Sequence, residues 1–119
     1  MLYTSYFNNI PNLPSTIIPI AICAKCPDDY SGLHYLKLKP TWEIWQSWTA
    51  NHNELEYARK FNLDVLSPLD PKLIATELHQ MANSDDVALI CYENPKQFCH
   101  RHLVATWFNN NGIPCKEYR

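Results

Sequence analysis

Short, nearly continuous apolar runs alternate with stretches of helical periodicity along this chain. Residues 17–24 read IIPIAICA, and residues 87–91 read VALIC. Apolar runs of this length, without polar alternation, are typical of strands that are buried on both faces. Residues 2–7 and 114–118 form two further segments that favour strand. Pro19 cannot donate a hydrogen bond to a sheet, so we expect it near the start of its strand.

Helical spacing dominates the middle and the end of the chain. Trp42, Trp45 and Trp48 recur at intervals of three residues, a pattern that favours the buried face of a helix over an exposed stacking platform. Three further helices are indicated by their start and stop signals. These signals are Asn53 with Glu56 as a capping pair, Asp70 with Pro71 at a helix start, and Gly112 after a helix over about residues 98–110.

Strands that alternate with helices predict an α/β fold, namely a single three-layer domain with a mostly parallel sheet flanked by helices. The length of 119 residues fits one domain, residues 1–119, with its own hydrophobic core. In such sheets, ligands bind beside the carboxyl ends of the strands. This rule directs attention to the residues that follow the two buried strands.

Reactive side chains gather where the 87–91 strand ends and where the last helix begins. The strand end carries Cys91, Tyr92 and Glu93, and the helix start carries Cys99, His100 and Arg101. The other buried strand ends near Cys23, Lys25 and Cys26. If the two strands are parallel neighbours, all three groups meet at one edge of the sheet. We therefore predict one polar site built from these segments.

The same residues carry a resemblance to a known family. The chain resembles the domain of unknown function 488 family, which shares an early buried strand with a basic residue and proline, an aromatic loop with glycine, a K-L-x-P-x-W-E segment and a late C-x-E-x-P…C-H-R motif. The matching positions are Lys25, Pro27, Tyr30, Gly32, Lys37, Leu38, Pro40, Trp42, Glu43, Cys91, Glu93, Pro95, Cys99, His100, Arg101, Leu103, Val104 and Ala105. The resemblance implies a compact α/β fold with a shared polar site, and no specific activity. Lys25 stands where the family usually has Arg, which removes a bidentate anion clamp there.

The residue types at this site favour a small anionic ligand. Arg101, His100 and Lys25, with the free N–H groups of the first helical turn, are suited to hold a phosphate, as on a nucleotide-like molecule. Cys91, Tyr92 and Trp42 are further candidate ligand-binding residues, since an aromatic ring that borders the site would stack on a base. An alternative is that Arg101 pairs with Glu93 or Glu43 and only locks the loop.

Catalysis is the second question that the motif raises. Cys99 beside His100 at a helix start is a candidate nucleophile with a lowered pKa, and Glu93 is placed to orient the imidazole. The pattern is compatible with an enzyme or with a binding protein, and the assignment stays open here.

A non-enzymatic metal-binding or interaction protein is the alternative function. Cys23 and Cys26 have C-x-x-C spacing, and Cys91, Cys99, His100 and His102 offer further ligands for zinc. Structural zinc sites usually pair two such close spacings, and the second pair here is separated by seven residues. We therefore predict no metal ligands and no cofactor from sequence alone.

The composition of the chain limits the kinds of binding partner that we expect. The net charge is −2 without a run of Lys or Arg, which disfavours non-specific binding to nucleic acid. Residues 1–10 lack the pattern of a signal peptide, and no apolar stretch is long enough to span a membrane. Five cysteines without a secretory signal favour free thiols in a cytoplasmic protein.

Overall fold

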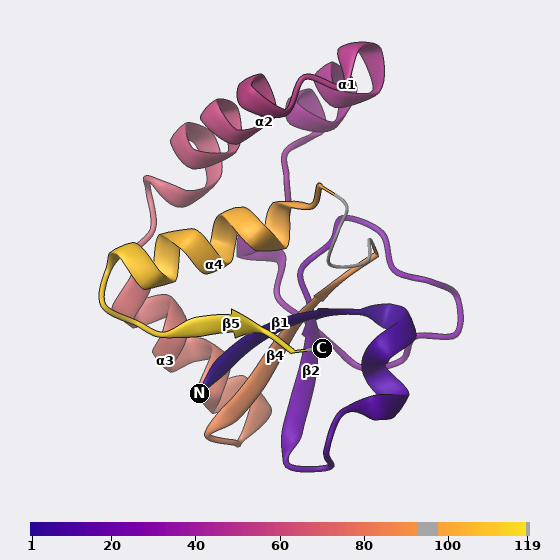
Figure 1. Cartoon of the computed structure of the whole chain (residues 1–119), viewed down its shortest axis with the longest axis vertical. Helices are drawn as coiled ribbons and strands as arrows, with labels where there is room; N and C mark the ends of the chain where they lie inside the picture. The colour runs from indigo at the N-terminus through magenta and orange to yellow at the C-terminus, as the bar shows by residue number, and fades with distance from the viewer. Residues whose placement is uncertain (93–97, 119) are drawn as a thin grey trace.

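The computed structural model describes residues 1–92 and 98–118 and has a five-stranded sheet at its centre (Figure 1). The strand order is β3-β2-β4-β1-β5, and every neighbouring pair is parallel. The strands are β1 (Leu2–Tyr6), β2 (Ile17–Ala21), β3 (Leu33–His34), β4 (Asp86–Cys91) and β5 (Cys115–Glu117). The predicted α/β class with a parallel sheet flanked by helices is confirmed.

The two long apolar runs are the adjacent strands β2 and β4, in register from Ile17 opposite Asp86 to Ala21 opposite Ile90. Pro19 lies in the middle of β2 rather than at its start. The sheet accommodates the missing N–H because β3 pairs only with Ile20 and Ala21, so at Pro19 the strand has β4 as its one neighbour in the described sheet.

Within the described residues, four α-helices and three short helical segments connect and cover the strands. The α-helices are α1 (Trp42–Asn51), α2 (Glu54–Phe61), α3 (Pro71–Ala82) and α4 (His100–Asn110). The short segments are the 3-10 turns η1 (Phe7–Asn12) and η2 (Leu36–Leu38) and the π-helical turn η3 (Asn62–Leu66). Figure 1 shows α1 and α2 together at one end of the molecule, with α4 between them and the sheet.

The helix starts follow their capping residues. Asn53 accepts a hydrogen bond from the backbone N–H of Glu56, and Asp70 accepts one from that of Lys72. Gly112 follows α4 with a φ of 76°, a left-handed conformation that costs glycine little. The two N-terminal capping signals therefore have a physical basis, because the Asn53 and Asp70 side chains each satisfy a helix N–H that has no partner within the helix.

The two faces of the sheet are covered differently. Side chains alternate across a strand, so Leu2, Val87 and Leu89 share one face, where they pack against residues of all four α-helices. Ala88 and Ile90 point to the other face and pack against η1 and the chain that follows it. The α-helices thus form one layer, and η1 with its neighbouring loop forms the other.

The tryptophans of α1 do not form the buried stripe that their spacing predicts. The side chains of Trp42 and Trp45 are 64% and 47% exposed, whereas Ile44 is buried and Trp48 is half-buried. Each step of three residues falls about 60° short of a full turn. Trp48 therefore ends up beside Ile44 on the packed side, while Trp42 lies nearly opposite. The exposed Trp42 and Trp45 rings stack on each other at 5.1 Å.

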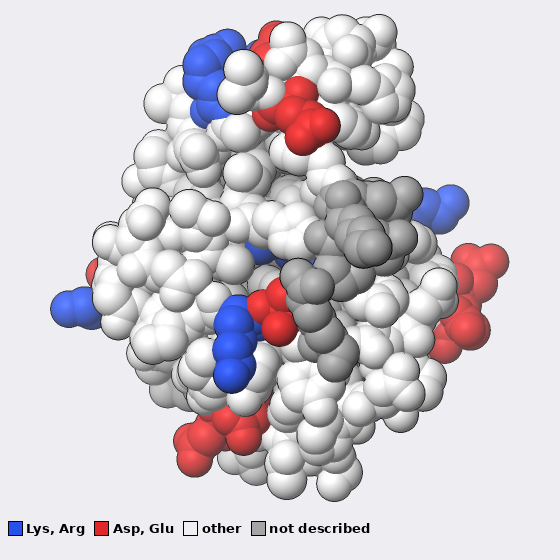
Figure 2. Space-filling view, in the orientation of Figure 1, with Lys and Arg blue, Asp and Glu red and all other residues white. Residues whose placement is uncertain are grey.

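On the face drawn in Figure 2, the charged side chains of the described residues are few, and basic and acidic groups are interspersed without an extended area of one sign. No helix within residues 1–92 and 98–118 is long and apolar enough to cross a lipid bilayer.

Candidate functional site

A pocket of about 230 Å³, here called the inner pocket, opens at the carboxyl ends of β2 and β4. Among the described residues, its polar lining is Cys23, Lys25, Cys91, Cys99 and His100. Its remaining lining is mostly aromatic: Ala24, Pro40, Trp45, Trp48, Tyr57, Tyr92 and Phe98. The three chain segments that the sequence placed at one edge of the sheet therefore meet in a single pocket.

A cluster of two thiols and one imidazole lies at the floor of the inner pocket. His100 Nδ1 is 3.6 Å from Cys91 Sγ and 4.0 Å from Cys99 Sγ. All three side chains are buried, and their potential ligand atoms lie within 4.8 Å of one another. Cys91 is the last residue of β4, and Cys99 is the N-cap residue of α4. Two well-packed elements therefore fix the positions of the thiols.

A hydrogen bond to the backbone determines which His100 nitrogen faces the thiols. His100 Nε2 lies 2.7 Å from the carbonyl oxygen of Ile22. A carbonyl oxygen only accepts, so Nε2 carries the hydrogen and donates it. In the neutral imidazole, Nδ1 is then unprotonated and points its lone pair at Cys91 and Cys99. The ring is held further by Phe61, whose centroid is 5.4 Å away.

The environment of Cys99 favours the thiolate. A hydrogen bond from Cys91 and the charge and hydrogen bond of His100 lower the pKa of Cys99 well below its ordinary value, against the opposing effect of burial. The position at the start of α4 acts in the same direction. Cys23 behaves in the opposite way, because burial and the nearby Cys26 thiol raise its pKa. The catalytic role of Cys99 stays a prediction, and these contacts are the ones that it would need.

Arg101 is not available to a ligand in the inner pocket, contrary to our expectation. Its side chain is 0% exposed and forms a bidentate ion pair with Glu117, at 3.2 Å from Nε to Oε1 and 3.0 Å from Nη2 to Oε2. The guanidinium also lies over the ring of Tyr6. It turns away because residues next to each other on a helix diverge by about 100°. The alternative interpretation, in which Arg101 forms an internal ion pair, agrees better with the structure. Its partner is Glu117 and not Glu43.

Only some of the other candidate site residues line the inner pocket. Lys25 and Tyr92 line the inner pocket, as Cys91 does. Trp42 does not, because the turn of α1 carries it away from the floor. Glu93 lies outside the described residues. Among the six candidate zinc ligands, the compact group contains Cys91, Cys99 and His100, and does not contain Cys23, Cys26 or His102.

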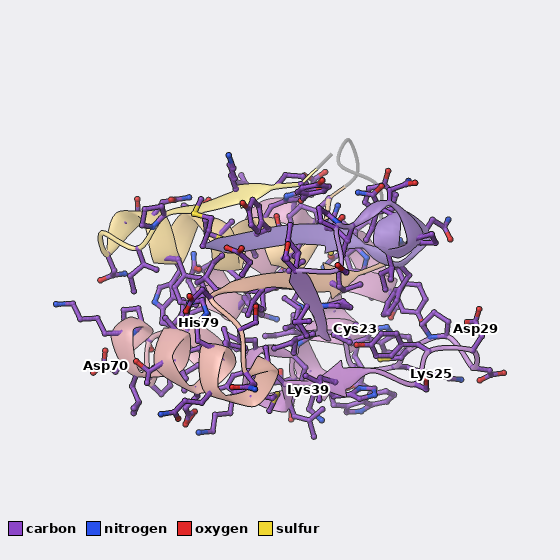
Figure 3. All side chains as sticks on the ribbon, turned by 90° about the horizontal axis from the view of Figure 1, so that it is seen from below. Cys23, Lys25, Asp29, Lys39, Asp70 and His79 are labelled. Carbon is purple, nitrogen blue, oxygen red and sulfur yellow. The ribbon has the colours of Figure 1, made fainter. Side chains whose placement is uncertain are left out.

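A second hollow, here called the outer groove, adjoins the inner pocket. It measures about 370 Å³ and shares Ala24, Lys25, Pro40 and Trp45 with the inner pocket. Lys39, Thr41 and Trp42 complete its lining. Figure 3 shows Cys23 and Lys25 toward one side of the molecule, with Asp70 and His79 on the opposite side. Two lysines and a stacked pair of tryptophans thus border the entrance to the thiol cluster.

Sequence reasoning missed most of the aromatic wall. Trp48, Tyr57 and Phe98 come from α1, α2 and the segment before α4, and Phe98 packs against Trp48 at 5.0 Å and against Tyr57 at 5.1 Å. Trp48 was detectable as the third tryptophan of the α1 series. Tyr57 and Phe98 carry no local signal, because their meeting depends on how α2 and α4 pack.

Cys115 provides a test of how strongly burial controls thiol reactivity. Burial raises the pKa of Cys115 to about 12, so its thiol stays protonated and unreactive near neutral pH. We expect iodoacetamide at about pH 8 to leave Cys115 unmodified in the folded protein and to modify it in urea. Peptide mass spectrometry measures both, with the half-buried Cys26 as the internal reference. Equal labelling of the two cysteines in the folded protein would contradict the expectation.

A family model described as the active DUF488-N3 subclade, DUF488-N3a, matches residues 15–112. The match includes β2, β4 and the whole of α4, and thus every described residue that lines the inner pocket. No curated protein and no solved structure matches the chain.

Proposed function

The chain belongs to the DUF488 family, and from this premise and the geometry of its pocket we propose that it binds a small nucleotide-like molecule, with a planar ring and a phosphate group. The ring enters the inner pocket, and the phosphate lies toward Lys25 at the entrance. The observation that carries the proposal is the combination of aromatic walls, a basic rim and a reactive thiol in one pocket.

The walls of the inner pocket favour a flat ring. Trp48 and Phe98 lie nearly parallel, with an interplanar angle of 26°, and Tyr57 meets Phe98 edge-on. Rigid aromatic walls offer large contact area at low entropic cost, and each stacked base contributes about 1–3 kcal/mol in proteins that bind bases this way. The inner volume of about 230 Å³ is below the usual 300–1,000 Å³ of small-molecule sites, so only part of such a ligand fits inside.

The outer groove supplies space and positive charge for the part of the ligand that does not fit in the inner pocket. Lys25 borders both hollows and Lys39 borders the groove, so a phosphate that leaves the inner pocket passes two ammonium groups. Arg101 has no part in this proposal because Glu117 neutralises it. The scattered surface charge fits a small ligand better than a long nucleic acid, whose binding draws on many basic contacts.

The floor of the pocket supports chemistry as well as binding. His100 Nδ1 is positioned to take the Cys99 proton, which leaves a thiolate nucleophile beneath the bound ring. The description of the matched subclade as active favours a reaction. All five cysteines are free, which suits a reducing compartment such as the cytoplasm.

Binding is tested by quenching of tryptophan fluorescence with adenosine, guanosine, cytidine and uridine monophosphates. We expect at least one of them to quench the signal, since Trp45 and Trp48 line the pocket. Lys25→Gln removes the charge at the rim and should weaken that binding about tenfold, which corresponds to about 1.4 kcal/mol.

Lys72→Gln is the matched control, because Lys72 is an exposed lysine on α3, away from the pocket. It should leave the dissociation constant unchanged. The proposal is wrong if none of the four nucleotides binds the wild-type protein, or if the two lysine variants lose affinity equally.

A further inference from the structure

We infer that Cys91, Cys99 and His100 form a binding site for a zinc ion with one coordination position open to the inner pocket. The inference rests on the placement of three side chains at the floor of the pocket. Two thiolates and one imidazole are a known donor set of catalytic zinc sites, in which water or substrate occupies the fourth position.

The two sulfur–nitrogen distances in the cluster are close to those that zinc requires. With Zn–S bonds of about 2.3 Å and Zn–N bonds of about 2.0–2.1 Å, tetrahedral geometry separates sulfur from nitrogen by about 3.6 Å. The observed separations from His100 Nδ1 are 3.6 Å to Cys91 Sγ and 4.0 Å to Cys99 Sγ. A shift of a few tenths of an ångström in the Cys99 side chain would therefore complete the geometry.

The backbone around the cluster orients the imidazole as metal sites do. A zinc-bound histidine commonly donates its second ring N–H to a carboxylate or backbone carbonyl, which fixes the tautomer. His100 Nε2 donates to the Ile22 carbonyl oxygen at 2.7 Å and leaves Nδ1 toward the two sulfurs. Because Ile22 follows β2 while Cys91 ends β4, two adjacent strands hold the ligand set in place.

The metal would face the space that the proposed ligand occupies. All three side chains line the inner pocket, so the position opposite them opens toward the aromatic walls. There the ion would polarise a water molecule or a ligand oxygen as a Lewis acid. In this state Cys99 is a metal ligand, and it does not act as the nucleophile. This role toward a ligand rests on the proposed function, whereas the metal site itself depends only on the three side chains.

The test is the metal content of the full chain, purified without a histidine tag or chelator and measured by plasma mass spectrometry. We expect close to one zinc per chain. Cys91→Ser and Cys99→Ser should lose most of it, and Cys115→Ser, which changes another buried cysteine outside the group, should keep it. Cys26→Ser should also keep it, because Cys26 is not in the group and its thiol contacts Cys23 and His34 instead.

Cobalt substitution provides a second measurement that does not depend on the yield of the variants. Co²⁺ added to metal-free wild-type protein should give a thiolate-to-cobalt charge-transfer band and the visible absorption of a tetrahedral site. The inference is overturned if the wild-type protein holds no zinc and gives no such band, or if zinc persists in both Cys91→Ser and Cys99→Ser. Nucleotide binding is measured separately by fluorescence, so failure of the metal site leaves the proposed function standing.

Discussion

Replacing Arg101 with Ala is expected to lower the free energy of unfolding by about 3–5 kcal/mol. The Arg101 side chain is fully buried, and that of Glu117 is only 11% exposed. Removal of the guanidinium leaves a carboxylate that is largely shielded from water, with Thr4 as its other hydrogen-bond donor among the described residues. The midpoint and slope of urea denaturation, followed by tryptophan fluorescence, measure the loss.

Lys37→Ala serves as the matched control, because Lys37 pairs with Glu77 in an exposed ion pair. That substitution should lower the free energy of unfolding by no more than about 1 kcal/mol. A double variant, Arg101→Met with Glu117→Leu, should recover part of the stability that Arg101→Ala loses, since no charge then stays buried. A stably folded Arg101→Ala protein with impaired nucleotide binding would instead return Arg101 to the ligand site.

Replacing Phe61 with Ala is expected to have the second large effect and to lower the free energy of unfolding by about 3–5 kcal/mol. Phe61 is fully buried at the end of α2, where it packs beside Tyr57 and His100. The cavity left by the ring would open under the imidazole and remove the wall that supports it. We therefore expect loosened metal and nucleotide binding as well as lower stability, both measurable on the same purified protein.

Leu63→Ala is the control for this substitution. Leu63 is 60% exposed in the neighbouring turn η3, so its truncation should change stability by no more than about 0.5 kcal/mol. If Phe61→Ala unfolds at the same urea concentration as the wild type, the packing described for α2 is wrong.

The sequence was informative wherever a local signal has one physical meaning. Apolar runs without polar alternation gave β2 and β4, and the caps Asn53 and Asp70 gave the starts of α2 and α3. The rule that parallel strands end at one edge correctly predicted that Cys23 and Cys91 lie in one pocket.

The errors arose where a side chain's direction depends on tertiary packing. Arg101 follows His100 directly, yet His100 faces the pocket while Arg101 turns toward Tyr6 and Glu117. Glu117 reaches it through β5, a strand of three residues whose register on β1 has no sequence signature. The aromatic wall could not be predicted for the same reason, because Tyr57 and Phe98 are 41 positions apart in the sequence and meet only through tertiary packing.

The strand order has a consequence for how the chain matures during synthesis. Leu2 pairs with Val87 on one side and Cys115 on the other, and β2 likewise needs β4. Both partners of β1 follow it in the chain, so its two edges stay unpaired until residues 86–91 are synthesised. Because β1 and β2 both pair with β4, we expect a nascent chain halted before residue 86 to bind chaperones.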